Sequence, residues 1–198
     1  MDALMQYAGI AAAIWIVWGV FVASLFYPNY SHSRQFCSEL GAFDSPVQKL
    51  SPAINNYPLG VLFIAFGYYL VSEFASHLPT IFIGAMVIVH GVCTWICGWF
   101  PMDADPYTTE PSPSCQIHSW SGVVMLISLI VAPAIVICSD FYPSYLRIFS
   151  AICILGCIGF SYKLAQAFSA KTVPGLYQRL SYGCQILWLF GFACFIVS

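Results

Sequence analysis

Six long runs of apolar residues alternate with polar stretches along the chain. A helix needs about 20 apolar residues to cross the hydrocarbon core of a bilayer, and each run reaches or approaches that length. The pattern therefore predicts membrane-spanning helices over residues 7–27, 57–75, 80–100, 118–138, 145–168 and 180–197. Because these spans use most of the 198 residues, we expect an all-α polytopic membrane protein that forms a single six-helix transmembrane bundle.

The composition supports a membrane protein and excludes a nucleic-acid partner. Hydrophobic residues make up 60% of the chain and charged residues only 7%, against about 25% charged residues in soluble domains. A net charge of -2 leaves too little positive charge to neutralise a run of phosphates. The expected partner is therefore a membrane lipid, and the composition gives no indication of the oligomeric state.

Three of the connecting segments, residues 28–56, 101–117 and 169–179, emerge on the same side of the membrane, which we call the loop face. Most basic residues lie there (Arg34, Lys49, Lys171 and Arg179), and Arg147 lies on the other side. The positive-inside rule would then place the loop face in the cytoplasm. A disulfide between the two loop cysteines, Cys37 and Cys115, would require the opposite orientation, and the cysteine count leaves both options open.

Glycines recur every seven residues in the second and third spans, at Gly60 and Gly67 and at Gly84, Gly91 and Gly98. Seven residues are two helical turns, so each set lies on one side of its helix. Small residues let helix backbones approach closely in a membrane. We expect these two spans to pack together as an antiparallel hairpin.

Polar residues suited to chemistry gather at the loop face. Ser38 and Glu39 follow the first span, Asp103 follows the third, and His118 is expected to begin the fourth. Two carboxylates, an imidazole and a hydroxyl can bind a divalent metal or perform general acid–base chemistry. Glu39, His118, Asp103 and Ser38 are therefore the candidate catalytic residues, and Glu39, Asp103 and His118 are the candidate ligands if a metal is present. The alternative is a capped turn and a solvated acidic loop next to an interfacial histidine.

Two further residues are candidates for binding a substrate. His90 lies near the middle of the third span, where ionisable groups are rare and face the bundle interior, so we expect it to have a partner. Cys93, Thr94 and Cys97 share its helix face, which leaves a His/Cys metal site as the alternative. Arg179, just before the sixth span, is placed to meet a carboxylate or an anionic lipid phosphate, or simply to anchor the helix at the interface.

Four short motifs in this order resemble a known family: Ser38-Glu39-Leu40-Gly41, Phe100-Pro101-Met102-Asp103, His118 and Gly175-Leu176-Tyr177-Gln178-Arg179-Leu180. The chain resembles, over nearly its whole length, the prokaryotic membrane family called domain of unknown function 998. Gln178 departs from the family pattern, which has an acidic residue there. The family is similar to the Frag/DRAM/Sfk group of six-helix proteins, which is linked to lipid-anchor remodelling and membrane trafficking. It is more distantly similar to ceramidase-like hydrolases, although only His90 and His118 match their three zinc-binding histidines.

The resemblance implies an integral protein of the prokaryotic inner membrane, with a cytoplasmic N-terminus and the loop face outside. Together with the polar residues, it suggests a pocket at the loop face that binds a lipid or lipid head group and, in the enzymatic version, processes it as a membrane-embedded hydrolase or transferase. One alternative is a non-catalytic lipid-binding or scaffolding protein. The other is a small proton-linked transporter in which His90 relays protons.

Overall fold

The computed structural model describes residues 2–198, in which every regular element is a helix. Six of these helices are long and apolar enough to cross a membrane, which confirms the predicted all-α membrane bundle. They are α2 (Ala8–Leu25), α4 (Asn56–Glu73), α5 (Leu78–Trp99), α6 (Pro113–Cys138), α7 (Ser144–Ser169) and α8 (Pro174–Val197). The short helices α1 (Asp2–Met5), η1 (Cys37–Gly41) and α3 (Leu50–Ile54) lie outside the spans.

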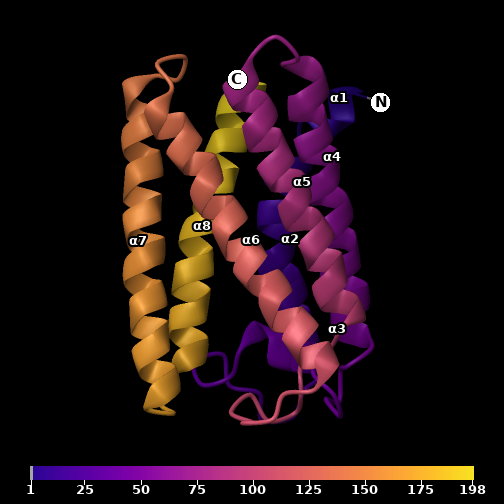
Figure 1. Ribbon diagram of the computed structural model, residues 1–198. Coiled ribbons are helices and arrows are strands. Elements are labelled where there is room, and N and C mark those ends of the chain that lie inside the picture. Colours follow the sequence, from indigo (N-terminus) through magenta and orange to yellow (C-terminus); the bar gives the residue numbers. More distant parts are fainter. Residues whose placement is uncertain (1) are drawn as a thin grey trace.

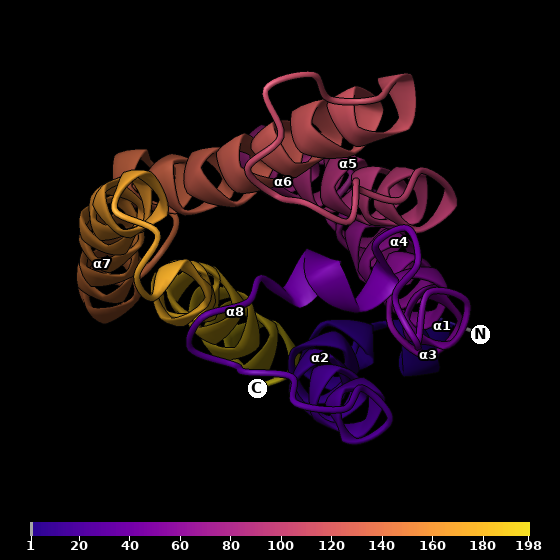
Figure 2. The same cartoon turned by 90° about the horizontal axis from the view of Figure 1, so that it is seen from below.

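The six long helices form a closed ring when the bundle is seen along its axis (Figure 2). Each helix packs against its neighbour in the order α2, α4, α5, α6, α7, α8, and α8 closes the ring against α2. Both chain ends lie at one end of the bundle (Figure 1). Loop one (residues 26–55), which carries η1 and α3, and loop three (residues 100–112) lie together at the opposite end, the loop face.

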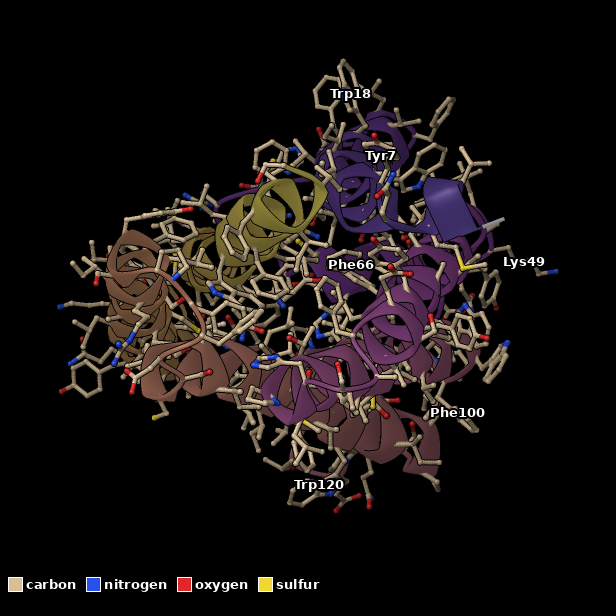
Figure 3. All side chains as sticks on the ribbon, turned by 90° about the horizontal axis from the view of Figure 1, so that it is seen from above. Tyr7, Trp18, Lys49, Phe66, Phe100 and Trp120 are labelled. Carbon is tan, nitrogen blue, oxygen red and sulfur yellow. The ribbon has the colours of Figure 1, made fainter. Side chains whose placement is uncertain are left out.

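Aromatic residues divide between the bundle interior and its outer surface. Phe66 is fully buried among the helices, whereas Trp18 and Trp120 point outward (Figure 3) and are 62% and 71% exposed. Trp188 and Phe192 stack at 5.2 Å in the core, and the indole of Trp188 donates a hydrogen bond to Ser150 Oγ at 2.9 Å. The exposed aromatic surface is the part that faces lipid in a membrane.

The glycines hold α4 and α5 at close range, as their spacing predicts. A Cβ atom added to Gly67 would lie 2.5 Å from the carbonyl oxygen of Gly84, and one added to Gly84 would lie 2.7 Å from that of Gly67. Similarly, a Cβ on Gly91 would approach Gly60 O to 2.9 Å. The two backbones are therefore in contact, and no larger residue fits between them.

Two helices begin earlier than the apolar runs predict. Helix α6 starts at Pro113 rather than at His118, and α8 starts at Pro174 rather than at Leu180. Proline is well suited to the first helical position because its fixed φ is helical and its missing N–H has no intrahelical partner there. His118 consequently lies in the second turn of α6, and the motif from Gly175 to Arg179 is helical.

Candidate functional site

The first turns of α8 are hydrogen-bonded to loop one through the guanidinium of Arg179. Its Nη1 donates hydrogen bonds to the carbonyl oxygens of His32, Gln35 (2.8 Å) and Gly175 (3.0 Å), and its Nη2 donates to the hydroxyl of Tyr30 at 2.6 Å. The Tyr30 hydroxyl in turn donates to Phe36 O at 2.7 Å. Burial raises the pKa of Tyr30, so this hydroxyl keeps the proton that it donates. Arg179 is therefore a bridge between α8 and loop one.

The neighbours of Arg179 on α8 make further contacts with loop one. Gln178 Oε1 accepts from the backbone N–H of Cys37 at 2.8 Å, and the N–H of Leu176 donates to Ser33 O at 2.8 Å. A Cβ atom on Gly175 would lie 2.1 Å from Gln35 O. The motif thus needs a glycine for close approach and an acceptor at position 178. Because the amide of Gln178 supplies that acceptor, the missing acidic residue is not required for this contact.

Glu39 holds the turn η1 in place. Its Oε1 accepts from the N–H of Phe36 at 2.7 Å and its Oε2 accepts from Gln35 Nε2 at 3.2 Å. Its half-buried position raises the pKa of the carboxyl group, against these hydrogen bonds, which lower it. Ser38 makes no side-chain hydrogen bond within residues 2–198. Glu39 therefore caps its own turn, and no nucleophile–base pair forms at Ser38 in the part of the chain described.

Asp103 caps the start of α6. Its Oδ1 accepts from the hydroxyl of Ser112 at 2.6 Å and its Oδ2 from the N–H of the same residue at 2.9 Å. These two donors hold the pKa of Asp103 below its usual range. Ser112 Oγ is the N-cap acceptor for Cys115 N at 3.2 Å. Asp103 therefore fixes the residue that begins the helix.

His118 fastens loop three to α6. Its Nδ1 lies 2.8 Å from the carbonyl oxygen of Phe100; a carbonyl only accepts, so Nδ1 carries the proton. Nearby, Ser114 Oγ donates to Pro101 O at 2.8 Å. These two side chains hold the chain where it leaves α5.

His90 has the partners that its mid-span position predicts. It is 0% exposed. Its Nδ1 lies 3.2 Å from Met125 O and 3.3 Å from Ser128 Oγ, and its Nε2 lies 3.1 Å from the hydroxyl of Tyr182. Because the carbonyl of Met125 accepts, Nδ1 donates and Nε2 accepts from Tyr182. His90 on α5 is thereby tied to both α6 and α8.

The predicted loop-face residues do not converge on one point, and His90 lies apart from them in the middle of α5. Loops one and three meet where Phe43 N donates to Met102 O at 2.9 Å and where Ala42, Met102 and Cys115 form a small apolar cluster. Within residues 2–198, no three His, Cys, Asp or Glu side chains are grouped closely enough to hold a metal. The expected trio of Glu39, Asp103 and His118 is thus not assembled, because each is engaged with backbone near its own helix or turn. Cys37 and Cys115 are free thiols.

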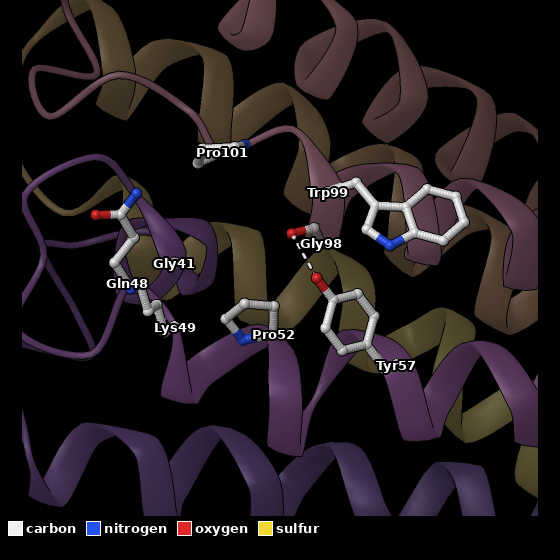
Figure 4. Close-up of a pocket in the computed structure, with 8 residues that line it drawn as sticks. All are labelled: Gly41, Gln48, Lys49, Pro52, Tyr57, Gly98, Trp99 and Pro101. Carbon is white, nitrogen blue, oxygen red and sulfur yellow. Dashed lines mark hydrogen bonds between the residues drawn. The ribbon is translucent and has the colours of Figure 1, made fainter.

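Sequence reasoning missed a hollow of about 340 Å³ at the loop end of α4 and α5 (Figure 4). Its lining comes from loop one, the first turn of α4, the end of α5 and the start of loop three: Gly41, Gln48, Lys49, Pro52, Tyr57, Gly98, Trp99 and Pro101. The Tyr57 hydroxyl donates to Gly98 O at 3.3 Å across this hollow. A sequence signal did exist, since Tyr57 and Trp99 lie at span ends, where interfacial aromatic residues gather.

A second hollow of about 300 Å³ adjoins the first on the outer surface of the α4–α5 hairpin. It is lined by Tyr57, Val61, Trp95 and Trp99, so it shares Tyr57 and Trp99 with the first hollow. The indole of Trp95 donates to Tyr57 O at 3.0 Å. A Cβ on Gly60 would lie 2.2 Å from the Trp95 ring, so this glycine makes the space in which the indole lies.

The chain matches one protein family, described as "Protein of unknown function (DUF998)", over residues 10–194. No curated protein and no solved structure matches it. The expected similarity to the Frag/DRAM/Sfk group therefore stays a prediction.

Proposed function

The chain belongs to the DUF998 family, and we propose that it is a non-catalytic lipid-binding protein of the prokaryotic inner membrane. The observation that carries this proposal is the pair of adjoining hollows at the loop end of α4 and α5. One lies at the level of the loops and the other on the outer, membrane-facing surface. A lipid matches this arrangement, because its polar head group would lie at the level of the loops and its apolar chains along the membrane-facing surface.

The motif residues support this proposal as positioning residues for the walls of the first hollow. Glu39 fixes η1, whose last residue, Gly41, lines it. His118 holds Phe100, and the chain continues directly into Pro101, which also lines it. A rigid, preformed site loses less conformational freedom on binding a ligand. This role explains why motifs far apart in the sequence act on one end of the bundle.

Binding without turnover is favoured over hydrolysis by the engagement of the candidate catalytic groups. Both carboxylate oxygens of Glu39 and of Asp103 accept hydrogen bonds from their own surroundings, and His118 Nδ1 is committed to a backbone carbonyl. Hydrolysis needs an activated nucleophile or a metal-bound water. Within residues 2–198, Ser38 has no base as a hydrogen-bond partner, and no three His, Cys, Asp or Glu side chains are grouped to hold a metal.

Proton transport is also disfavoured, because His90 is bonded on both ring nitrogens. One bond goes to a backbone carbonyl, which has no proton to exchange. His90 is therefore better explained as a tie between helices than as a relay.

Native mass spectrometry of the purified protein in mild detergent tests the proposed function. We expect phospholipid to remain bound to the wild type and to be lost from Trp99→Ala. Trp120→Ala is the matched control, because Trp120 is also an exposed tryptophan near the loop face but lines neither hollow. A wild type without lipid, or equal loss in both variants, would contradict the proposal. Release of a hydrolysed lipid product would contradict its non-catalytic part.

We further propose that the loop face lies outside the cytoplasm. The charge pattern that favoured the opposite orientation is weakened because Arg179 is committed to loop one, so its position does not report insertion freely. Single cysteines can be introduced at the exposed residues Thr109, on the loop face, and Ser76, on the opposite side. In spheroplasts, a membrane-impermeant maleimide should label Thr109→Cys above the wild-type level and label Ser76→Cys only after permeabilisation. The reverse pattern would place the loop face in the cytoplasm.

A further inference from the structure

The first hollow carries a single charge, and that charge has no partner within residues 2–198. Among its eight lining residues, Lys49 is the only one with a charged side chain. Lys49 is exposed and extends away from the bundle (Figure 3). The one ion pair within residues 2–198 joins Arg147 and Asp140 at the other end of the molecule. The ammonium group of Lys49 is therefore available to an external anion.

Gln48 provides a second polar group next to Lys49 (Figure 4). Its Oε1 accepts from the N–H of Asp44 at 3.3 Å, which orients the amide. Its Nε2 has no hydrogen-bond partner in the part of the chain that the structure describes. Both N–H groups of this amide can thus be donated to an acceptor in the hollow, and the polar end of the site offers donors and a positive charge.

The other end of the site is apolar and continues toward the hydrocarbon. Tyr57 and Trp99 form the boundary between the two hollows, and Val61 and Trp95 extend the second one along the hairpin. Val61 and Trp99 are 55% and 58% exposed. One helical turn separates Tyr57 from Val61, so the apolar part descends about 6 Å below the first hollow. The polar and apolar ends are placed as the head group and the upper part of an acyl chain are placed in a lipid.

On these grounds we propose that the ligand is an anionic phospholipid, with its head-group phosphate at Lys49 and Gln48 and an acyl chain along Tyr57, Val61, Trp95 and Trp99. This inference rests on the proposed function and adds the chemical class of the lipid. A phosphate oxygen accepts the hydrogen bonds that the lysine and the glutamine amide donate. No carboxylate lines either hollow, so no negative charge there repels an anion. The second hollow favours a lipid over a free phosphate ion.

The charge preference of the site should depend on Lys49. A basic side chain at a membrane surface attracts anionic lipid strongly enough for about a five-fold preference. The wild type is mixed in detergent with equal amounts of phosphatidylglycerol and phosphatidylcholine of identical acyl chains, and the bound lipids are quantified by native mass spectrometry. We expect phosphatidylglycerol to be preferred by about five-fold, and Lys49→Gln to bind both lipids equally while its thermal unfolding is unchanged.

Arg34→Gln is the matched control. Arg34 is another exposed loop-face cation that lines neither hollow, so this variant should keep the wild-type preference. A wild type without preference, a preference that survives in Lys49→Gln, or an equal loss in Arg34→Gln would overturn the inference. If the lipids still bind in a Trp99-dependent manner, only the lipid class is refuted; if no lipid binds, the proposed function fails as well. Inorganic phosphate should not displace the lipid, and displacement at equal concentration would refute the acyl-chain part.

Discussion

The bridge formed by Arg179 gives the sharpest test of how the loop face is held together. Replacing Arg179 by methionine keeps much of the apolar stem and removes every donor. A hydrogen bond to a charged group contributes about 1.5–3 kcal/mol. Two of the bonds to loop one, to Tyr30 Oη at 2.6 Å and to Gln35 O at 2.8 Å, are counted at the low end because the guanidinium is only partly buried. We therefore expect loop one to lose about 3 kcal/mol of docking free energy.

Hydrogen exchange measures this loss directly. A change of about 3 kcal/mol raises the opening equilibrium by about 150-fold, so peptides covering residues 30–41 should exchange much faster in Arg179→Met. Those peptides include the amide of Cys37, which donates to Gln178. Arg147→Met is the matched control, because it removes the ion pair with Asp140 at the other end of the bundle. Unchanged exchange over residues 30–41, or the same increase in both variants, would refute the bridging role.

Three further predictions address other contacts. His90→Phe should lower the free energy of unfolding by about 2 kcal/mol, because buried polar partners lose their bonds, and Tyr182→Phe should cost less in that background than in the wild type when measured by thermal unfolding in detergent. Gly175→Ala should speed exchange in residues 30–41, because the new methyl group would displace Gln35 O; wild-type exchange would refute the contact. The depressed pKa of Asp103 contributes stability that is present above its unfolded pKa of about 4 and lost as the pH falls through its lower folded value. Asp103→Asn should therefore destabilise the protein more at pH 7 than at pH 3, and a pH-independent difference in unfolding temperature would contradict this.

The sequence predicts the spans well because twenty apolar residues in a row have few alternatives to a membrane helix. It places the starts of α6 and α8 less well, since the prolines and polar residues that begin these helices lie outside the apolar runs. His90 could be predicted to have a partner, but Tyr182 could not be identified, because it lies 92 residues away in the sequence. The hollow was missed for the same reason: its walls combine two loops and two helix ends, and no single segment carries its pattern.

Two of the cations at the loop face, Arg179 and Lys49, show why residue type and environment must be considered together. Arg179 belongs to a motif and suggested a phosphate-binding residue, yet its planar fork of donors suits several carbonyl oxygens at once, and loop one supplies two of them, from His32 and Gln35. Lys49 belongs to no motif, and its single flexible charge makes no bond within residues 2–198. A compact charge on a mobile stem can follow a lipid head group that moves in the membrane plane, whereas a guanidinium fixed by four acceptors cannot. Arg179 therefore helps to build the loop face, whereas Lys49 remains available to the proposed ligand.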